Sequence, residues 1–480
     1  MRAVRNLKVW AALLMVALAA SVLMAVVIAA PAQAAPFSVT NTADSGEGSL
    51  RQAISDANAS AGEDTINFDP SLSGQTITLG SQLPAITDGA GLVIDGGSAN
   101  ITVSGNSAVR VFAVGTPTIS GAKLTLNNLT VANGRSILGG GILNESSNTL
   151  TVSNSTLSGN NANEGFASGG GGIWNNGGML TVSNSTLSGN SANYAGGGIH
   201  NNSPGTLTVS NSTLSGNSVT DVDYGKGGGI SSNGGSVTLK NTIVANSPSG
   251  GSCYGTITNG GYNLDSDGSC GFGTTNYSLS GTTATPLDPQ LGSLANNGGP
   301  TLTHALLAGS PAIDKGSSFS ATIDQRGLPR PSNFVGIVNA DDGSDIGAFE
   351  SQAPPDTTAP KVTNTTVPAA GAMQVGPGVN VTATFTEAMD ARTTDGDPST
   401  INGTTVKLFR AGTTTAIGAV VSYNATTNKA TLNPNSNLRL GTKYKAVVTT
   451  GAQDLAGNRL DQNSSLGGLQ QKTWTFTTRG

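Results

Sequence analysis

Apolar and polar residues alternate along the middle of the chain in copies of one undecapeptide. The stretch LTVSNSTLSGN occurs three times without change, at 150–160, 180–190 and 207–217. Degenerate copies stand at 124–134 (LTLNNLTVANG) and 237–247 (VTLKNTIVANS), so successive copies start 26, 30, 27 and 30 residues apart. A repeat of this length is typical of a solenoid, in which each unit packs only on its neighbours.

Each copy predicts a strand, a corner and a second strand, because its apolar residues follow a period of two rather than a helical period. Leu150, Val152 and Leu157 point inward in this interpretation, as does Ile173 of the GGGI motif that follows. So few inward apolar residues cannot form a core within one unit, and the units must therefore stack as a parallel β-helix. Two continuous apolar columns are expected: Leu124, Leu150, Leu180, Leu207 and Val237, and Leu126, Val152, Val182, Val209 and Leu239.

One column of the predicted stack is polar, and it consists of Asn128, Asn154, Asn184, Asn211 and Asn241. An amide carries both donors and acceptors, so identical Asn side chains on neighbouring coils can form a hydrogen-bonded ladder. Asn also tolerates a left-handed corner. The alternative is an N-glycosylation acceptor at Asn154-Ser155-Thr156, which we favour less because Asn241-Thr242-Ile243 loses that pattern.

A short helix is predicted over residues 49–59 at the start of the stack. Ser49 and Gln52 have the spacing of a capping box, and Leu50, Ala53 and Ile54 share one face. We interpret this helix as a lid over the first coil, since a solenoid must cover its open ends. Further coils are expected through 75–79, 91–97, 101–106 and 109–114.

The segment 296–350 is expected to close the other end of the β-helix, which would span residues 35–350. His304 lies in this segment, and a structural hydrogen bond is its expected role. A buried or half-buried charge network is expected from Asp324, Arg326, Arg330 and Asp345.

A second domain follows a Pro/Thr linker at 351–360. Its alternating strands are expected at 379–385, 405–409, 418–423, 429–432, 444–449 and 473–476. This pattern predicts an antiparallel β-sandwich over residues 361–478. No cysteine pair lies in this domain, so Phe385, Tyr444 and Trp474 are expected to anchor its core.

The N-terminus has the pattern of an export signal over residues 1–34. Arg2, Arg5 and Lys8 precede an apolar run at 9–30, and Ala32-Gln33-Ala34 is a small-x-small cleavage site. The run is long enough to remain as an uncleaved anchor, and that alternative stays open. We favour cleavage, an extracellular or cell-surface location, and no membrane span in the mature chain.

Charge and cysteine content limit the function classes. Removing residues 1–34 leaves 20 Lys and Arg against 28 Asp and Glu, a net charge of −8. This charge opposes binding to nucleic acid, which requires a positive field. Cys253 and Cys270 are the only cysteines, and in an oxidising compartment we expect a disulfide; two free, half-buried thiols are the alternative.

Several segments resemble exported bacterial proteins. The motifs GGGI and LSGN resemble the repeats of polymorphic outer-membrane proteins, with Leu157 where Phe is usual. Residues 37–68 resemble the CSLREA-type start of such proteins, with Gly48 in place of its Cys, and 296–350 resemble the choice-of-anchor Q module. These resemblances imply a right-handed parallel β-helix in an exported surface protein, mostly without an assigned activity.

The second domain resembles the SbsA-type bacterial Ig-like domain. The resemblance rests on FTEAMD at 385–390, LRLGTKYKAVV at 438–448, DLAGN at 454–458 and the closing WTFTT at 474–478. It implies an Ig-like β-sandwich that acts as a spacer or an adhesive module.

The repeats contain few ionisable residues that could support catalysis. Between 124 and 247 the acids do not share a coil position with a basic partner; they are Glu145, Glu164, Asp221 and Asp223. His200 fills the position after GGGI that Leu143, Trp174 and Ser231 fill in other coils, so a surface or turn site is expected. These features favour a protein without catalytic residues or a bound cofactor.

Calcium is the one cofactor considered. Asp341, Asp342 and Asp345 lie in NADDGSD, and Asp265 and Asp267 lie in LDSDG. Both loops lack the spacing of an EF-hand, so solvated turns are favoured.

The sequence therefore predicts an exported, non-catalytic surface or secreted protein. It would serve in adhesion or as an envelope component, and its polar outer faces would bind polysaccharide or protein weakly at many coils. The alternative is a carbohydrate-active enzyme, a lyase or a hydrolase, with a groove near Trp174 and Tyr194.

Overall fold

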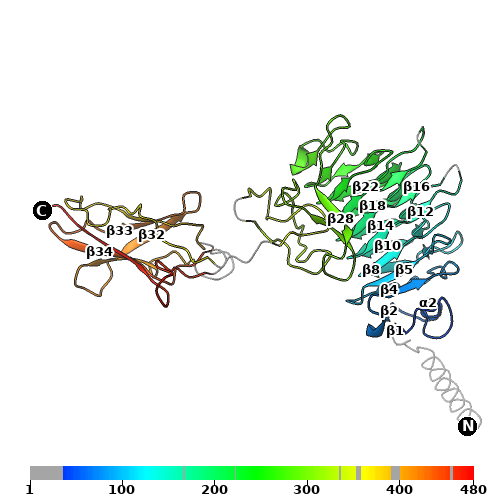
Figure 1. Cartoon of the computed structure of the whole chain (residues 1–480), viewed down its shortest axis with the longest axis horizontal. Helices are drawn as coiled ribbons and strands as arrows, with labels where there is room; N and C mark the ends of the chain where they lie inside the picture. The colour runs from blue at the N-terminus through cyan, green and yellow to red at the C-terminus, as the bar shows by residue number, and fades with distance from the viewer. Residues whose placement is uncertain are drawn as a thin grey trace, which may run out of the picture. The chain divides into compact units, whose positions relative to one another are not determined.

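The chain divides into two units after residue 353, and each is described by itself (Figure 1). The computed structural model describes residues 36–165, 168–221, 223–334, 337–352, 358–390, 400–454 and 458–480. The predicted export signal at 1–34 and part of the predicted linker at 351–360 lie outside these residues. No helix in the described ranges is long and apolar enough to cross a membrane.

The N-terminal unit is a parallel β-helix, so the predicted fold class is confirmed. Sheet A contains β1 (Pro36–Val39), β2 (Asp64–Phe68), β4 (Leu92–Asp95), β7 (Lys123–Asn127), β10 (Thr149–Ser153), β14 (Met179–Ser183), β18 (Thr206–Ser210), β22 (Ser236–Lys240) and β25 (Thr258–Asn259). Sheet B contains β3 (Thr76–Thr78), β5 (Ile101–Ser104), β8 (Leu129–Ala132), β11 (Thr156–Ser158), β15 (Thr186–Ser188), β19 (Thr213–Ser215), β23 (Ile243–Ala245), β26 (Leu264–Asp265) and β27 (Leu279–Ser280). Sheet C contains β6 (Phe112–Val114), β9 (Ile142–Asn144), β13 (Ile173–Asn176), β17 (Ile199–Asn202), β21 (Ile230–Asn233) and β24 (Cys253–Tyr254). A short fourth sheet contains β12 (Asn161–Ala162), β16 (Ser191–Ala192) and β20 (Ser218–Val219).

The two predicted apolar columns are the core of this unit. Leu150 pairs with Leu124 on one side and with Leu180 on the other, and Val152 pairs in the same way with Leu126 and Val182. The whole of both columns is buried in one apolar cluster. The polar undecapeptide is therefore stable because its few apolar residues meet their own copies one coil away.

The predicted Asn column forms the corners between sheets A and B. All five residues have left-handed backbones, with φ between 45° and 52°, so the conformational prediction is confirmed. The predicted continuous amide ladder is wrong, because only Asn241 donates directly to another column member, Asn211, at 2.9 Å. The remaining corners have different neighbours, to which their Nδ2 atoms donate: Asn128 to Asp95, Asn154 to Asn127, Asn184 to Ile323 and Asn211 to Ser318.

Two other columns form the amide ladders. Asn160, Asn190 and Asn217 end the exact copies of the undecapeptide and are fully buried. Asn160 Nδ2 donates to Asn190 Oδ1 at 2.9 Å, and Asn190 Nδ2 donates to Asn217 Oδ1 at 2.9 Å. A second buried ladder joins Asn144, Asn175 and Asn201, with both links at 2.7 Å. Each ladder satisfies the amides that it links, whereas Asn144 Oδ1, at the end of the second ladder, has no partner among the described residues.

The predicted lid helix is present as α2 (Leu50–Ala59). Ser49 is its N-cap and Ser49 Oγ accepts the Gln52 backbone N–H, whereas the Gln52 side chain donates to Asp56 instead of completing a capping box. Leu50 and Ile54 are fully buried and belong to the apolar cluster of the coils. Figure 1 shows α2 beside β1 and β2 at the N-terminal end of the stack.

Residues 296–350, named here the lateral segment, lie along the side of the β-helix, so the prediction that they close its end is wrong. Thr156 Oγ1 of β11 donates to Leu302 O at 2.6 Å, and Thr213 Oγ1 of β19 accepts the Ala348 N–H at 3.0 Å. Short antiparallel strands β28 (Leu291–Ala295) and β29 (Thr303–Leu306) begin this crossing. The segment has no periodic apolar pattern with which to form a terminal coil. It packs instead on the outside of sheet B, through hydroxyls and through an apolar cluster that includes Ile243, Leu264 and its own Ile346.

The C-terminal unit contains two antiparallel three-stranded sheets. One contains β30 (Val381–Thr384), β33 (Lys429–Pro434) and β32 (Ala419–Asn424), and the other contains β31 (Val406–Arg410), β34 (Lys443–Val448) and β35 (Lys472–Thr477). Phe385, Tyr444 and Trp474 are all buried in its core, as predicted. The expected strands are all present, with boundaries that shift by only a few residues.

Replacement of Asn190 tests the amide ladder. Asn190→Ala removes the acceptor of the buried Asn160 backbone N–H and of one of the two Asn160 Nδ2 hydrogen bonds, so we expect the free energy of unfolding to fall by about 1–3 kcal/mol. Asn202, whose amide donates to Asn176 in a half-exposed row, is the matched control, and Asn202→Ala is expected to change stability by less than about 0.5 kcal/mol. Denaturant unfolding measures both, and equal losses would contradict the ladder's role.

Candidate functional site

The outer face of sheet A carries a row of threonines across the coils. Neighbouring strands of sheet A pair in register, so one outward residue of each strand falls in the same row. The threonines of this row are named here the threonine row: Thr65, Thr125, Thr151, Thr181, Thr208, Thr238 and Thr258. Val93 stands between Thr65 and Thr125 and interrupts it. Among the described residues, none of these hydroxyls has a hydrogen-bond partner. Thr258 is exposed and the other six side chains are half-buried, so the row is partly open to solvent.

The threonine row is rigid and regularly spaced. Neighbouring strands lie about 4.8 Å apart, and each Thr side chain stands on a strand with restricted χ1. Thr149 and Thr206 extend the face on one side, and Ser153 and Ser183 extend it on the other. Its charges lie at the margins, in Lys123 on one side and in Asp95 and Lys240 on the other. The centre of the face is therefore a neutral array of hydroxyl and methyl groups.

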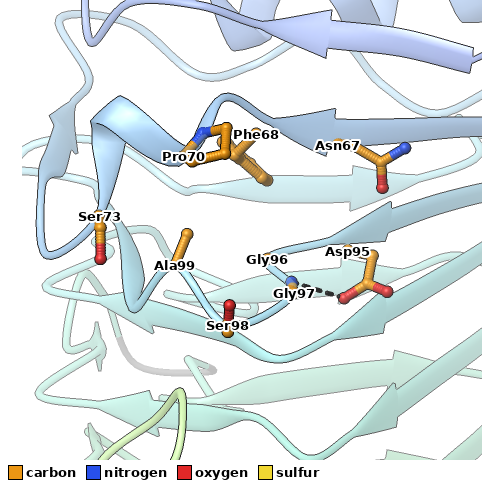
Figure 2. A pocket seen from close by; sticks show the side chains of 9 residues that line it. All are labelled: Asn67, Phe68, Pro70, Ser73, Asp95, Gly96, Gly97, Ser98 and Ala99. Carbon is orange, nitrogen blue, oxygen red and sulfur yellow. Dashed lines mark hydrogen bonds between the residues drawn. The ribbon is translucent and has the colours of Figure 1, made fainter.

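A hollow opens at the N-terminal end of the same face, where the chain makes longer corners. The corners of one or two residues found from β7 to β23 are replaced by residues 69–75 after β2 and by residues 96–100 after β4. The hollow between them, named here the N-terminal pocket, has a volume of about 290 Å³. Its lining residues are Asn67, Phe68, Pro70, Ser73, Asp95, Gly96, Gly97, Ser98 and Ala99 (Figure 2).

The N-terminal pocket combines polar groups with an apolar wall. Asn67 and Asp95 are paired neighbours on β2 and β4, at one side of the hollow. Asp95 Oδ1 accepts the Gly97 N–H at 2.8 Å and Asn128 Nδ2 at 3.0 Å, which fixes the carboxylate. In the part of the chain that is described, Asp95 Oδ2 and the Asn67 amide have no partner. Figure 2 shows Phe68 and Pro70 opposite residues 97–99.

A second hollow of about 340 Å³ lies between residues 116–120 and 145–147. Its carboxylate, Glu145, already accepts a hydrogen bond from Asn176 Nδ2 at 2.9 Å. Its polar groups are therefore less available than those of the N-terminal pocket.

The predicted charge network is present under the lateral segment. Arg330 Nε lies 2.8 Å from Glu350 Oε2, and both side chains are fully buried. Arg326 lies 2.7 Å from Asp324, and its guanidinium stacks on the Phe349 ring. Burial raises the pKa of Glu350 to about 7. These groups cannot contact a substrate, so the network holds the lateral segment together and does not form an active site.

The calcium candidates do not converge on one point. Asp342 accepts the N–H groups of Ser318 and Ser344, and the buried Asp345 accepts those of Asp314 and Ser351. Across the described ranges, no group of three or more His, Cys, Asp or Glu side chains is placed to hold a metal ion. Asp342 and Asp345 therefore act as turn caps.

Both histidines are buried within the β-helix unit. His304 Nε2 lies 2.9 Å from Ser188 Oγ and its Nδ1 donates to Gly292 O, so its predicted structural hydrogen bond is confirmed. His200 was expected at the surface, and that prediction is wrong. It is buried because its ring packs on Trp174 of the neighbouring coil, with centroids 4.2 Å apart, and burial lowers the pKa of His200 to about 4.

Two further predictions concern charge and covalent pairing. The disulfide between Cys253 and Cys270 is confirmed.

The prediction that no repeat acid shares a coil position with a base is wrong for Glu164, because Glu164 Oε1 lies 2.9 Å from Arg135 Nε of the preceding coil. Both side chains are about half exposed, and an ion pair of this kind contributes little to stability.

Sequence reasoning missed both parts of the candidate site. The threonine row was readable in the repeats as the residue between two inward apolar positions. The pocket was not readable, because it arises where two corners without repeats lie next to each other. The predicted Asn column borders the N-terminal pocket, since Asn128 donates to Asp95 of the pocket.

Comparisons with known proteins address the C-terminal unit. Residues 356–478 match the family of bacterial Ig-like domains. Similar solved structures include the S-layer protein rSbsC(31-844), at 20% identity and a TM-score of 0.18, over 25% of this chain and 14% of that one. Another is PcoC, a methionine rich copper resistance protein from Escherichia coli, at 17% identity and a TM-score of 0.19, over 25% of this chain and all of that one. The similarity is limited to a quarter of this chain, which spans far less than two thirds of the S-layer protein. The search of curated proteins gives no match.

The buried carboxylates predict a pH dependence of stability. Burial raises the pKa of Asp345 to about 6 and that of Glu350 to about 7, above their ordinary values. Folding then favours the protonated forms, so their contribution is complete below the unfolded-state pKa values and is lost as the pH rises through about 7. We expect the melting temperature of the β-helix to fall between pH 5 and pH 8, as measured by calorimetry.

Asp345→Asn removes one of these titrating groups and is expected to make the decline with pH shallower. Asp341→Asn, at an exposed position of the same loop, is the matched control and is expected to leave it unchanged. A melting temperature that rises from pH 5 to pH 8 in the unmodified protein would show that burial does not govern these groups.

Calcium is expected to have no effect on stability, because Asp342 and Asp345 already accept backbone N–H groups and the described carboxylates form no group of three that could hold a metal ion. Thermal melting with millimolar calcium and with a chelator measures this. An upward shift of the midpoint in calcium, abolished by Asp342→Asn, would restore the calcium hypothesis.

Proposed function

We propose that this is an exported, non-catalytic surface or secreted protein whose β-helix binds extended, neutral polysaccharide on the outer face of sheet A. Binding would be weak at each coil and cumulative along the stack. The partner class, the location and the absence of catalysis are all parts of this proposal.

The observation that carries the proposal is a second threonine row that is already occupied. Thr156, Thr186 and Thr213 occupy one row on the outer face of sheet B, beneath the lateral segment. Thr186 Oγ1 donates to Gln325 Oε1, and Gln325 Nε2 donates to Thr156 Oγ1. Outward hydroxyls on this β-helix therefore bind a polar side chain of a segment that crosses the coils, next to an apolar cluster that the same segment forms with sheet B.

The threonine row of sheet A offers the same groups without an occupant. It is neutral, and its hydroxyls recur about every 4.8 Å, close to the length of one sugar residue in an extended chain. A hydroxyl both donates and accepts, which suits the hydroxyls of a neutral sugar. Acidic polymers are disfavoured by the net charge of −8 expected for the mature chain.

Export and surface location are supported by three independent features. The first 34 residues have the pattern of a signal peptide, the chain contains a disulfide, and residues 356–478 match bacterial Ig-like domains. We propose that the Ig-like unit is of the SbsA type and acts as a spacer. We also propose that 37–68 is a CSLREA-type start and that the lateral segment is a choice-of-anchor Q module.

A carbohydrate-active enzyme is the rival function. It would require accessible paired carboxylates. Among the described residues of the lateral segment, Asp314, Asp324, Asp345 and Glu350 are fully buried, whereas Asp341 and Asp342 are exposed on a turn where Asp342 accepts backbone N–H groups. Trp174 and Tyr194, which would line the rival's groove, are half-buried, and Trp174 packs on His200. These observations favour binding without catalysis.

Valine substitutions in the threonine row test the proposal. The triple variant Thr151→Val, Thr181→Val and Thr208→Val keeps the β-branched shape and removes only the hydroxyls. We expect its retention by neutral polysaccharides such as xylan, glucomannan or cellulose to fall at least about tenfold, because several weak contacts are lost together. Affinity electrophoresis and pull-down measure this, and thermal melting checks the fold.

The matched control places the same three changes in the C-terminal unit, as Thr382→Val, Thr431→Val and Thr475→Val, at half-buried strand positions. The control variant should be retained by neutral polysaccharides as strongly as the unmodified chain. The proposal fails if no neutral polysaccharide is retained or if the sheet A variant binds normally. Release of shortened sugars from the same polymers would favour the rival enzyme.

A further inference from the structure

The N-terminal pocket stands apart from the rest of the outer face, because it is concave and holds the Asp95 carboxylate, one oxygen of which has no hydrogen-bond partner among the described residues. Asp95 and Asn67 lie on neighbouring strands in the row beside Thr65 and Val93. The pocket is therefore continuous with the surface proposed to bind polysaccharide, and it ends that surface at its first coils.

The polar groups of the pocket are held in place before any ligand binds. The two hydrogen bonds to Asp95 Oδ1 orient the carboxylate and leave Oδ2 to accept from a ligand. The Asn67 amide adds a donor and an acceptor on the adjacent strand. A carboxylate and an amide side by side recognise a pair of neighbouring hydroxyl groups, because the first only accepts and the second does both.

The opposite wall has the chemistry of the apolar face of a sugar ring. Phe68 is almost fully buried and supports the exposed Pro70, whose ring borders the hollow. Ser73 and Ser98 add exposed hydroxyls, which have no hydrogen-bond partners among the described residues. The hollow, with a volume of about 290 Å³, can enclose one pyranose ring, which the flat threonine row cannot do.

The charge of the site selects against acidic sugars. No basic side chain lines the pocket, so a uronate carboxylate would face Asp95 without a cation to offset it. A metal-bridged sugar is disfavoured as well, because one carboxylate gives a divalent ion too few ligands.

We infer that the N-terminal pocket is a subsite for one neutral hexopyranose residue, with Asp95 and Asn67 binding two adjacent hydroxyls and Pro70 packing on the ring. This inference rests on the proposed function, since it names the sugar unit that the β-helix binds at the end of its outer face. The threonine row supplies extended contact, and the pocket selects the sugar.

Titration of the full chain with single sugars tests the inference. The panel contains glucose, galactose, mannose and N-acetylglucosamine, with glucuronate and galacturonate as charged comparators. We expect at least one neutral sugar to bind with a Kd of about 1 mM, and both uronates to bind at least about tenfold more weakly. Saturation-transfer NMR and calorimetry measure both.

Variants assign the binding to the pocket. Asp95→Asn and Asn67→Ala are each expected to weaken binding about tenfold, the effect of one lost charge-assisted or bidentate contact. Ser98→Tyr, on an exposed corner, fills the hollow and should abolish binding without altering the strands. Asp88→Asn is the matched control, because Asp88 also caps a turn by accepting the Ala90 and Gly91 N–H groups but lies outside the pocket.

The outcomes separate this inference from the proposed function. If no neutral sugar binds, or if Ser98→Tyr binds as well as the unmodified chain, the subsite is wrong. Polysaccharide retention that still depends on the threonine row would leave the proposed function standing in that case. Sugar binding that is lost in Asp95→Asn, together with no retention of any polysaccharide, would support the pocket and reject the extended surface.

Discussion

Every coil of the N-terminal unit depends on the coil beside it, and this dependence governs the rest of the structure. One coil contributes only a few inward apolar side chains, so its core is completed by the same residues of its neighbours, as Leu150 is completed by Leu124 and Leu180. The same holds for polar groups, because the amide of Asn190 finds its partners in Asn160 and Asn217. A sequence that is mostly polar therefore folds, provided that the copies stay in register. The register also aligns the outward residues, which creates the threonine row as a direct result of the core packing.

The parts of the fold that repeat were predictable from the sequence, and the parts that do not repeat were not. A period of two within each copy was sufficient to identify the apolar columns and their register. It did not indicate which Asn points inward: Asn154 and Asn160 occur in the same undecapeptide, and only the second is fully buried and bonded within its own column. The difference arises from the left-handed corner at Asn154, which gives that side chain partners outside its column. The position of the lateral segment depends on hydroxyls more than 100 residues away, and no local pattern records such contacts.

The two parts of the candidate site divide in the same way. The threonine row is a consequence of the repeat, and its proposed role rests on comparison with the row on sheet B, which already holds Gln325. The N-terminal pocket depends instead on corners that differ from the repeat, where residues 69–75 and 96–100 leave space between two coils. The buried acids, in contrast, have strongly raised pKa values, a property often found at functional sites, yet they are enclosed by Arg330 and backbone amides. Accessibility, more than perturbed ionisation, separates binding groups from structural groups in this chain.

The lateral segment also has a mechanical consequence. A stack of coils under tension can peel from one end, one coil at a time, because each coil is held by its two neighbours alone. Gln325 hydrogen-bonds to Thr156 and Thr186, and Asn241 hydrogen-bonds to the backbone of Asp345 and accepts the N–H of Ser317. A pull on the stack must therefore break contacts to several coils at once, so the central coils share the load as one unit. The coils before Asn128 have no such tether among the described residues, and the N-terminal end is where a stretched molecule would yield first.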